Sequence, residues 1–130
     1  MPGSKPSPAP HPDIAAEARV LGRATLRAAA YLDIPDKTLA RIVGVSGSSI
    51  SRLRSGAYSF AGSAKAFELA ALFVRLFRGL DAIAGGDDEF SRSWLVAENA
   101  ALRGRPLDLI QTAHGLVGAI AYVDSRRAPL

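Results

Sequence analysis

The sequence predicts an all-α protein in which an N-terminal helical unit packs on a C-terminal helical unit. Two observations carry this expectation. Apolar residues recur at helical spacing through each long segment, and glycine or proline separates one such segment from the next. We expect a disordered Pro-rich tail over residues 1–12, the first unit over residues 13–62 and the second over residues 63–130.

The most informative stretch is the run of residues 36–56, where two short apolar repeats meet across Gly44. The repeating apolar positions are Leu39, Ile42, Val43, Ile50 and Leu53. This spacing predicts two short helices joined by a tight turn, because glycine tolerates the left-handed conformation that a sharp turn needs. Ser46 is suited to cap the second helix. The stretch therefore has the pattern of a helix-turn-helix.

The outer face of the second helix carries short hydroxyls and arginines. These candidate DNA-binding residues are Ser46, Ser48, Ser49, Ser51, Arg52 and Arg54. Hydroxyls allow a helix to approach base edges and phosphates, and an arginine can bond both O6 and N7 of guanine. Residues 36–60 carry four basic residues against one acid, whereas residues 86–130 carry five arginines against six acids. Positive charge thus gathers on the hairpin, which favours DNA binding. The alternative is a helical hairpin whose polar face is only solvated.

Several classes of site are disfavoured by composition and spacing. The 130 residues include no cysteine, and the two histidines, His11 and His114, have no neighbouring ligand cluster, so we expect no disulfide and no metal site. We find no Gly-rich phosphate loop, no GxSxG motif and no catalytic carboxylate pair, so we expect neither an enzyme nor a cofactor. Without an apolar run of membrane-spanning length or a secretory signal, we expect no membrane partner and a cytoplasmic location.

Two long helices are expected to flank the hairpin. The first runs from the cap Asp13 to about Leu32, with Ile14 on its inward face. The second runs from Ser63 to about Gly85 and carries a stripe of apolar residues that step by four and three. This stripe is the candidate dimerisation seam, Leu69, Phe73, Leu76, Leu80 and Ile83. The helix has more apolar surface than one small domain covers, so we expect the C-terminal third and a twin helix of a homodimer to share it.

The C-terminal block is expected to form short helices. Phe90, Trp94 and Leu95 should form the buried face of the first, and Gly104 should take a positive φ. Pro106 fits the first turn of the next helix, and Thr112 fits the cap of the last. In that last helix the glycines Gly115 and Gly118 should permit close approach of another backbone.

At this point the sequence resembles the Xre-type antitoxins whose C-terminal domain binds RES-domain toxins. The hairpin of residues 36–56 is similar to the Xre part of that family. The second motif is Asn99-x-x-Leu102-x-Gly104-x-Pro106-x-x-Leu109-Ile110-x-Thr112-x-x-Gly115, preceded by Trp94-Leu95. The resemblance covers about residues 14–125, and the long second motif makes it specific. His114 stands where the family usually has an acid.

The resemblance implies an antitoxin that blocks the active-site entrance of an NAD-degrading RES toxin and represses its own operon by binding operator DNA. The expected toxin-binding residues are Asn99, Arg103, Arg105, Tyr122, Asp124, Arg126 and Arg127. Residues after Val123 have left the apolar stripe of the final helix, and tyrosine and arginine often anchor interfaces. Adjacent Arg126 and Arg127 could together occupy an anion site of the toxin. The alternative function is a stand-alone transcriptional repressor whose C-terminal half only dimerises.

Overall fold

The computed structural model describes residues 12–127, and within that range the chain is helical, with one isolated bridge between Asn99 and Gly104 in place of any strand. The all-α prediction is confirmed. The expected tail lies outside the described residues, except that Pro12 is the first residue of α1. The elements in order are α1 (Pro12–Tyr31), α2 (Asp36–Val43), α3 (Gly47–Ser55), the 3-10 turn η1 (Phe60–Gly62), α4 (Ala64–Ala84), α5 (Asp88–Val96), α6 (Pro106–Leu109) and α7 (Ala113–Arg127).

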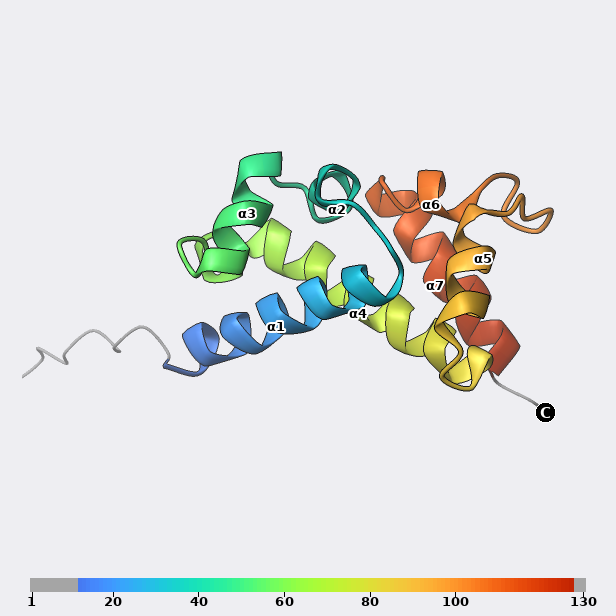
Figure 1. The fold of residues 1–130 in the computed structure, drawn as a ribbon, viewed down its shortest axis with the longest axis horizontal. Coiled ribbons are helices and arrows are strands. Elements are labelled where there is room, and N and C mark those ends of the chain that lie inside the picture. The colour runs from blue at the N-terminus through green and yellow to red at the C-terminus, as the bar shows by residue number, and fades with distance from the viewer. Residues whose placement is uncertain (1–11, 128–130) are drawn as a thin grey trace, which may run out of the picture.

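The long helix α4 is the axis of the molecule. It runs from beneath α3 to the far end of the molecule, where α5 and α7 lie (Figure 1). It packs against α1, α2 and η1, which precede it in the sequence, and against α5 and α7, which follow it. The expected boundary between residues 62 and 63 falls at its N-cap, Ser63, and stays a prediction. The helix itself contributes to the packing of both units.

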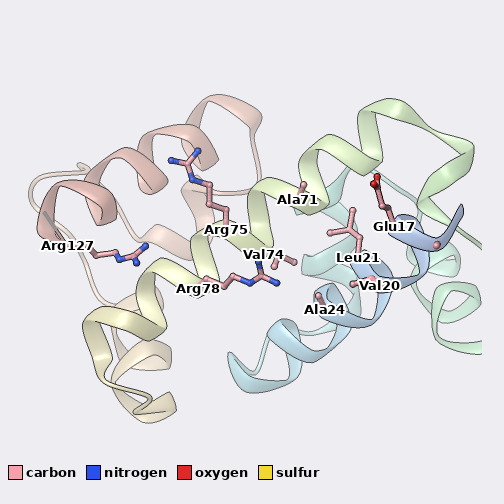
Figure 2. Close-up of a pocket in the computed structure, with 10 residues that line it drawn as sticks. Glu17, Val20, Leu21, Ala24, Ala71, Val74, Arg75, Arg78 and Arg127 are labelled. Atoms are coloured by element: carbon pink, nitrogen blue, oxygen red, sulfur yellow. The ribbon is translucent and has the colours of Figure 1, made fainter. Parts of the chain in front are cut away.

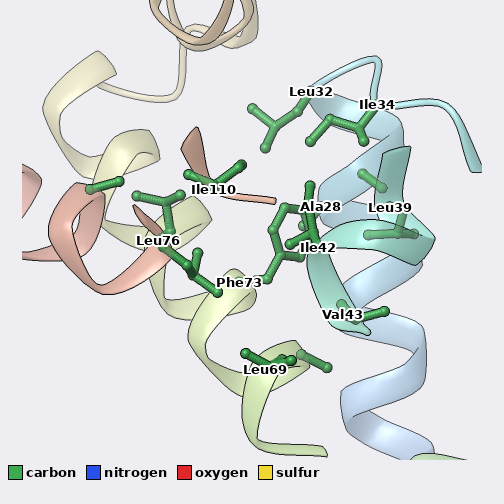
Figure 3. Packing of buried hydrophobic residues seen from close by; sticks show 14 of the residues in the cluster. Ala28, Leu32, Ile34, Leu39, Ile42, Val43, Leu69, Phe73, Leu76 and Ile110 are labelled. Atoms are coloured by element: carbon green, nitrogen blue, oxygen red, sulfur yellow. The ribbon is translucent and has the colours of Figure 1, made fainter. Parts of the chain in front are cut away.

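A single apolar core joins the two units through α4. Phe73 and Leu76 of α4 meet Ile110, which follows α6, and residues from α1 and α2 (Figure 3). Phe73 and Ile110 are fully buried, and Leu76 is 1% exposed. Burial of side chains of this size contributes about 1.5–3 kcal/mol each, so this junction is a large part of what holds the units together.

The prediction that the apolar stripe of α4 forms a dimerisation seam is wrong for four of its five residues. Leu69, Phe73, Leu76 and Leu80 are all buried within the chain, and only Ile83 is exposed, at 38%. The four buried side chains cannot meet a second copy because α4 already packs against α2 and α7 of the same chain. These four positions of the expected seam are covered within the chain.

Local signals place most helix ends where the sequence predicts them. Gly44 ends α2 with a φ of 73°, and Gly85 ends α4 with a φ of 63°. The Ser46 hydroxyl caps α3 by accepting the Ser49 N–H, and the Ser63 hydroxyl caps α4 in the same way. Each cap satisfies a backbone N–H that the helix leaves without an internal partner.

Other local expectations are wrong where neighbouring helices decide the outcome. Asp13 lies inside α1, which begins one residue earlier, and Ile14 is 47% exposed. Phe90 is 46% exposed, although Leu95 of the same helix is buried. The left-handed residue before α6 is Arg103, with a φ of 62°, and not Gly104.

Candidate functional site

The first candidate surface is the exposed face of α3. Its N-terminus is organised by hydroxyls, because Ser46 Oγ accepts the Ser49 N–H at 3.2 Å and shares a hydrogen bond with Ser49 Oγ at 2.8 Å. Ser49 is therefore buried, at 7% exposure, and the expectation that it faces outward is wrong. Ser48 and Ser51 are exposed, as expected.

Arg52 is the exposed cation at the centre of this face. Its guanidinium donates to Ser49 Oγ at 3.2 Å and to Ser48 Oγ at 3.4 Å. These bonds aim the side chain toward the N-terminus of α3, where the helix dipole also favours an anion. Arg52 with Ser48 and Ser51 thus forms a compact donor surface suited to phosphate or to base edges.

Arg54 has a different role from the one its sequence position suggests. Its guanidinium donates two hydrogen bonds to the Asp36 carboxylate, at 2.8 and 2.9 Å. This hydrogen bonding, with the charge attraction that accompanies it, lowers the pKa of Asp36. The fork links the first residue of α2 to the last turn of α3, so two of the Arg54 donors are already engaged within the chain.

The second candidate surface is a hollow of about 250 Å³ where the end of α4 meets α5 and α7. Trp94 and Tyr122 stack across it, with ring centroids 6.3 Å apart and planes 20° apart. The Arg126 guanidinium lies over the Tyr122 ring at 5.9 Å. The hollow is lined by Leu80, Ile83, Phe90, Trp94, Asn99, Tyr122, Val123 and Arg126, and we call it the aromatic hollow.

The aromatic hollow unites three of the seven expected toxin-binding residues, Asn99, Tyr122 and Arg126. Sequence reasoning assigned Phe90 and Trp94 to the core instead. The missed signal was a pair of i,i+4 repeats, Phe90 with Trp94 and Tyr122 with Arg126, since each pair places two large side chains on one helix face.

The other four expected toxin-binding residues lie elsewhere. Arg103 is exposed in the loop, and Arg105 at the N-cap of α6 pairs with Asp108 at 2.8 Å. Asp124 is engaged by Arg75 of α4 at 2.7 Å.

The pair of adjacent arginines does not act as a unit. Arg127 turns toward α4, where a Cβ added at Gly79 would lie 3.6 Å from its Nη1 atom. Arg126 points into the aromatic hollow. The expectation that Arg126 and Arg127 occupy one anion site is therefore wrong, because successive helix residues diverge by about 100° around the axis.

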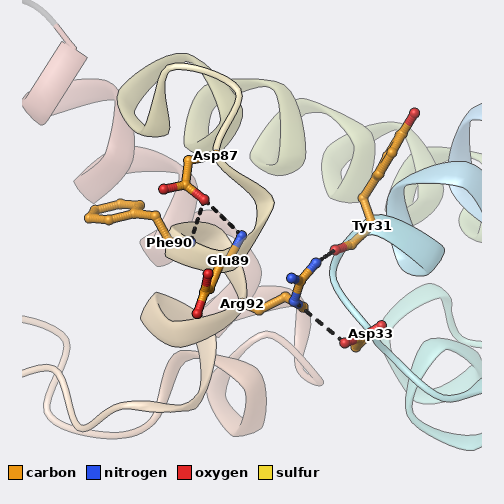
Figure 4. A network of polar contacts seen from close by, with 6 residues as sticks. All are labelled: Tyr31, Asp33, Asp87, Glu89, Phe90 and Arg92. Atoms are coloured by element: carbon orange, nitrogen blue, oxygen red, sulfur yellow. Dashed lines mark hydrogen bonds and ion pairs between the residues drawn. The ribbon is translucent and has the colours of Figure 1, made fainter.

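A polar contact connects the α5 side of the aromatic hollow to the helix-turn-helix (Figure 4). Arg92 donates to the carbonyl oxygen of Tyr31 at 3.0 Å and pairs with Asp33 at 3.4 Å. Asp33 has a φ of 54°, in the left-handed region that aspartate adopts more readily than most non-glycine residues. Arg92 thus stabilises the junction between α1 and α2 from the opposite unit.

Other kinds of site find no support in the part of the chain that the structure describes. No group of three or more His, Cys, Asp or Glu side chains gathers there as a metal site would require. None of the helices in residues 12–127 has the length and hydropathy needed to cross a membrane.

Comparison with known families agrees with this division into two surfaces. The antitoxin Xre-like helix-turn-helix domain matches residues 11–75, which carry α3. The antitoxin Xre/MbcA/ParS C-terminal toxin-binding domain matches residues 79–128, which include every lining residue of the aromatic hollow. A search of curated proteins returned no match. The helix-turn-helix match alone spans half of the 130 residues, and the two together span nearly all of them, so the chain belongs to the Xre-type antitoxins with a C-terminal toxin-binding domain.

Proposed function

We propose that this antitoxin neutralises an NAD-degrading RES-domain toxin through the aromatic hollow. The observation that carries the proposal is the exposed aromatic and cationic cluster within the toxin-binding domain. Phe90 is 46% exposed and Ile83 is 38% exposed beside Trp94, Tyr122 and Arg126. Aromatic and arginine side chains around a small hollow are the residue types that dominate binding energy in protein interfaces.

The aromatic hollow is suited to bind one apolar side chain and one anionic group of the toxin. Its floor of Leu80 and Val123 is apolar, and Arg126 supplies a cation at its edge. A carboxylate at the active-site entrance of the toxin would suit this cation, because a guanidinium forks onto a carboxylate through two hydrogen bonds. Only Arg126 is available for this contact, because Arg127 faces α4. The antitoxin has no role in catalysis in this proposal and needs no cofactor.

The test compares two variants when the toxin is co-expressed. Combining Phe90→Ala with Arg126→Ala removes an exposed ring and the cation of the aromatic hollow without opening the core. We expect toxin affinity to fall by about 2–4 kcal/mol, with loss of growth rescue and of cellular NAD. Arg19→Ala on α1, far from the aromatic hollow in sequence and fold, is the control. Full protection by the double variant at equal abundance would refute the proposal.

We further propose that the antitoxin binds operator DNA as a homodimer and thereby represses its own operon, in the cytoplasm. The exposed face of α3 supports this role, because Ser48, Ser51 and Arg52 present donors beside a helix N-terminus. Helix-turn-helix dimers place two such helices on paired half-sites. The match to a toxin-binding domain favours this combined role over a stand-alone repressor.

Arg52→Ala tests the DNA contact. If Arg52 bonds a guanine, operator affinity falls by about 1–3 kcal/mol, and if it holds a phosphate, the salt slope falls by about one unit. Arg103→Ala, which removes an exposed cation from the opposite unit, should leave operator binding intact. An Arg52→Ala variant with unchanged affinity and salt slope would exclude this face of α3 from the DNA interface.

A further inference from the structure

An open apolar groove runs between α1 and α4, away from both surfaces described above. Its volume is about 760 Å³, and none of its lining residues belongs to α3. Val20, Leu21 and Ala24 line it from α1, and Ala71 and Val74 line it from α4 (Figure 2). Val20 is 57% exposed, the largest exposure of a large apolar side chain in the part of the chain that the structure describes. An apolar strip of this kind on a small protein is characteristic of an interaction surface.

The charges of the groove differ between its two ends. Glu17 lies at one end, whereas Arg78 and Arg127 lie toward the other, with the apolar floor between them (Figure 2). Arg75 is also present but is paired with Asp124 of the same chain. No ion pair within residues 12–127 engages Glu17, Arg78 or Arg127. The groove therefore has a negative charge at one end and positive charge at the other, with apolar surface between them.

We infer that this groove is the homodimer interface, occupied by the same groove of a second copy. A two-fold axis through the apolar floor exchanges the ends, so Glu17 of each copy faces Arg78 of the other. A surface with opposite charges at its ends is self-complementary under this operation, as an isologous interface requires. The same operation places Val20 of each copy over the apolar floor of its partner.

The comparison with known families favours a second copy over the toxin as the occupant. Nine of the ten lining residues lie outside residues 79–128, which match the toxin-binding domain. The interface would also replace the α4 seam, which is buried within the chain. This inference rests on the proposed dimeric operator binding, but self-association is measured on the antitoxin alone and so can fail without the toxin proposal failing.

A charge-swap experiment tests the two-fold arrangement. Sedimentation velocity of the wild-type chain should give twice the chain mass of 13.6 kDa. Glu17→Arg and Arg78→Glu should each raise the dimer dissociation constant by about tenfold or more, because each places like charges together twice. An equal mixture of the two variants should restore dimers, since both cross-chain pairs are then attractive. Helical circular dichroism verifies that each variant is folded.

A second pair of variants tests the apolar floor. Val20→Asp should give monomers, whereas Val117→Asp, at a 53% exposed valine of α7 outside the groove, should leave the dimer intact. A wild-type chain that is monomeric at tens of micromolar would overturn the inference. So would a dimer that withstands Val20→Asp, or a mixture of charge variants that stays monomeric. Variants that change only toxin capture would show that the groove is a toxin contact instead.

Discussion

Substitution by alanine is expected to have opposite effects at the two glycines of α7, Gly115 and Gly118. A Cβ added to Gly115 would overlap the carbonyl oxygen of Leu109 and lie 2.6 Å from the carbonyl carbon, whereas nothing lies within 4 Å of a Cβ added to Gly118. Ordinary carbon contacts are about 3.5–4.0 Å, so Gly115→Ala requires the backbone at the end of α6 to move. Gly118→Ala requires no movement at all.

The cost at Gly115 follows from what the Leu109 carbonyl holds. It accepts the Thr112 N–H and the Thr112 hydroxyl, each at 3.3 Å, and that hydroxyl accepts the Gly115 N–H at 3.0 Å. Overpacking costs about 1–3 kcal/mol, and weakening these bonds adds about 1 kcal/mol, against about 1 kcal/mol gained in helix propensity. We expect Gly115→Ala to lower the free energy of unfolding by about 1–3 kcal/mol.

Gly118→Ala is the matched control, since it keeps the propensity gain and has no steric cost. It should raise the free energy of unfolding by about 0.5–1 kcal/mol. Urea unfolding followed by circular dichroism measures both variants, with the slope m checked for constancy. If Gly115→Ala proves as stable as Gly118→Ala, the close approach of α7 to the end of α6 is not as described.

Three further predictions concern polar groups within the chain: the pair of Asp36 and Arg54, the Thr25 hydroxyl and Arg92. Because Arg54 lowers the pKa of Asp36 below its ordinary value of 3.8, the pair's stabilisation, about 0.2–1 kcal/mol, should be complete above that pH. It should be lost as the pH falls through the folded-state pKa, and Asp36→Asn should flatten this part of an unfolding curve measured against pH. The Thr25 hydroxyl is fully buried without a partner, so Thr25→Val should raise the thermal midpoint rather than lower it. Arg92→Ala should destabilise the fold by about 1 kcal/mol in chemical unfolding, whereas Arg92→Lys should recover only part of that loss, because lysine has no fork to span both contacts.

The features predicted correctly from sequence are those that neighbouring residues decide. The turn at Gly44 and the caps at Ser46 and Ser63 depend on backbone groups within three residues, so local chemistry is sufficient to place them. Tyr122 and Arg126 do line one hollow, but that this hollow binds the toxin stays a prediction.

The features that sequence reasoning missed depend on which helix covers which face. Leu69 and Leu80 have the spacing of a seam, but periodicity does not say whether the cover is the same chain or a second one. Phe90 is of a residue type common in cores, yet it is 46% exposed at the aromatic hollow. The fork between Asp36 and Arg54 joins residues 18 apart in sequence, beyond the reach of any local pattern.

The continuity of α4 has a consequence for how the two surfaces of the antitoxin affect each other. Leu80 and Ile83, in its last turns, line the aromatic hollow, while Leu69 and Phe73, in the same helix, pack into the core that holds α1 and α2. Arg92 adds a polar link from α5 to the start of the helix-turn-helix. A ligand in the aromatic hollow therefore contacts a helix that also packs against α1 and α2, the two helices on which α3 rests. By thermodynamic linkage, any factor by which a bound toxin changes operator affinity is the factor by which the operator changes toxin affinity. Measuring the two affinities in both orders, with wild type and with Arg92→Ala, assigns that coupling to the polar link or to the shared core.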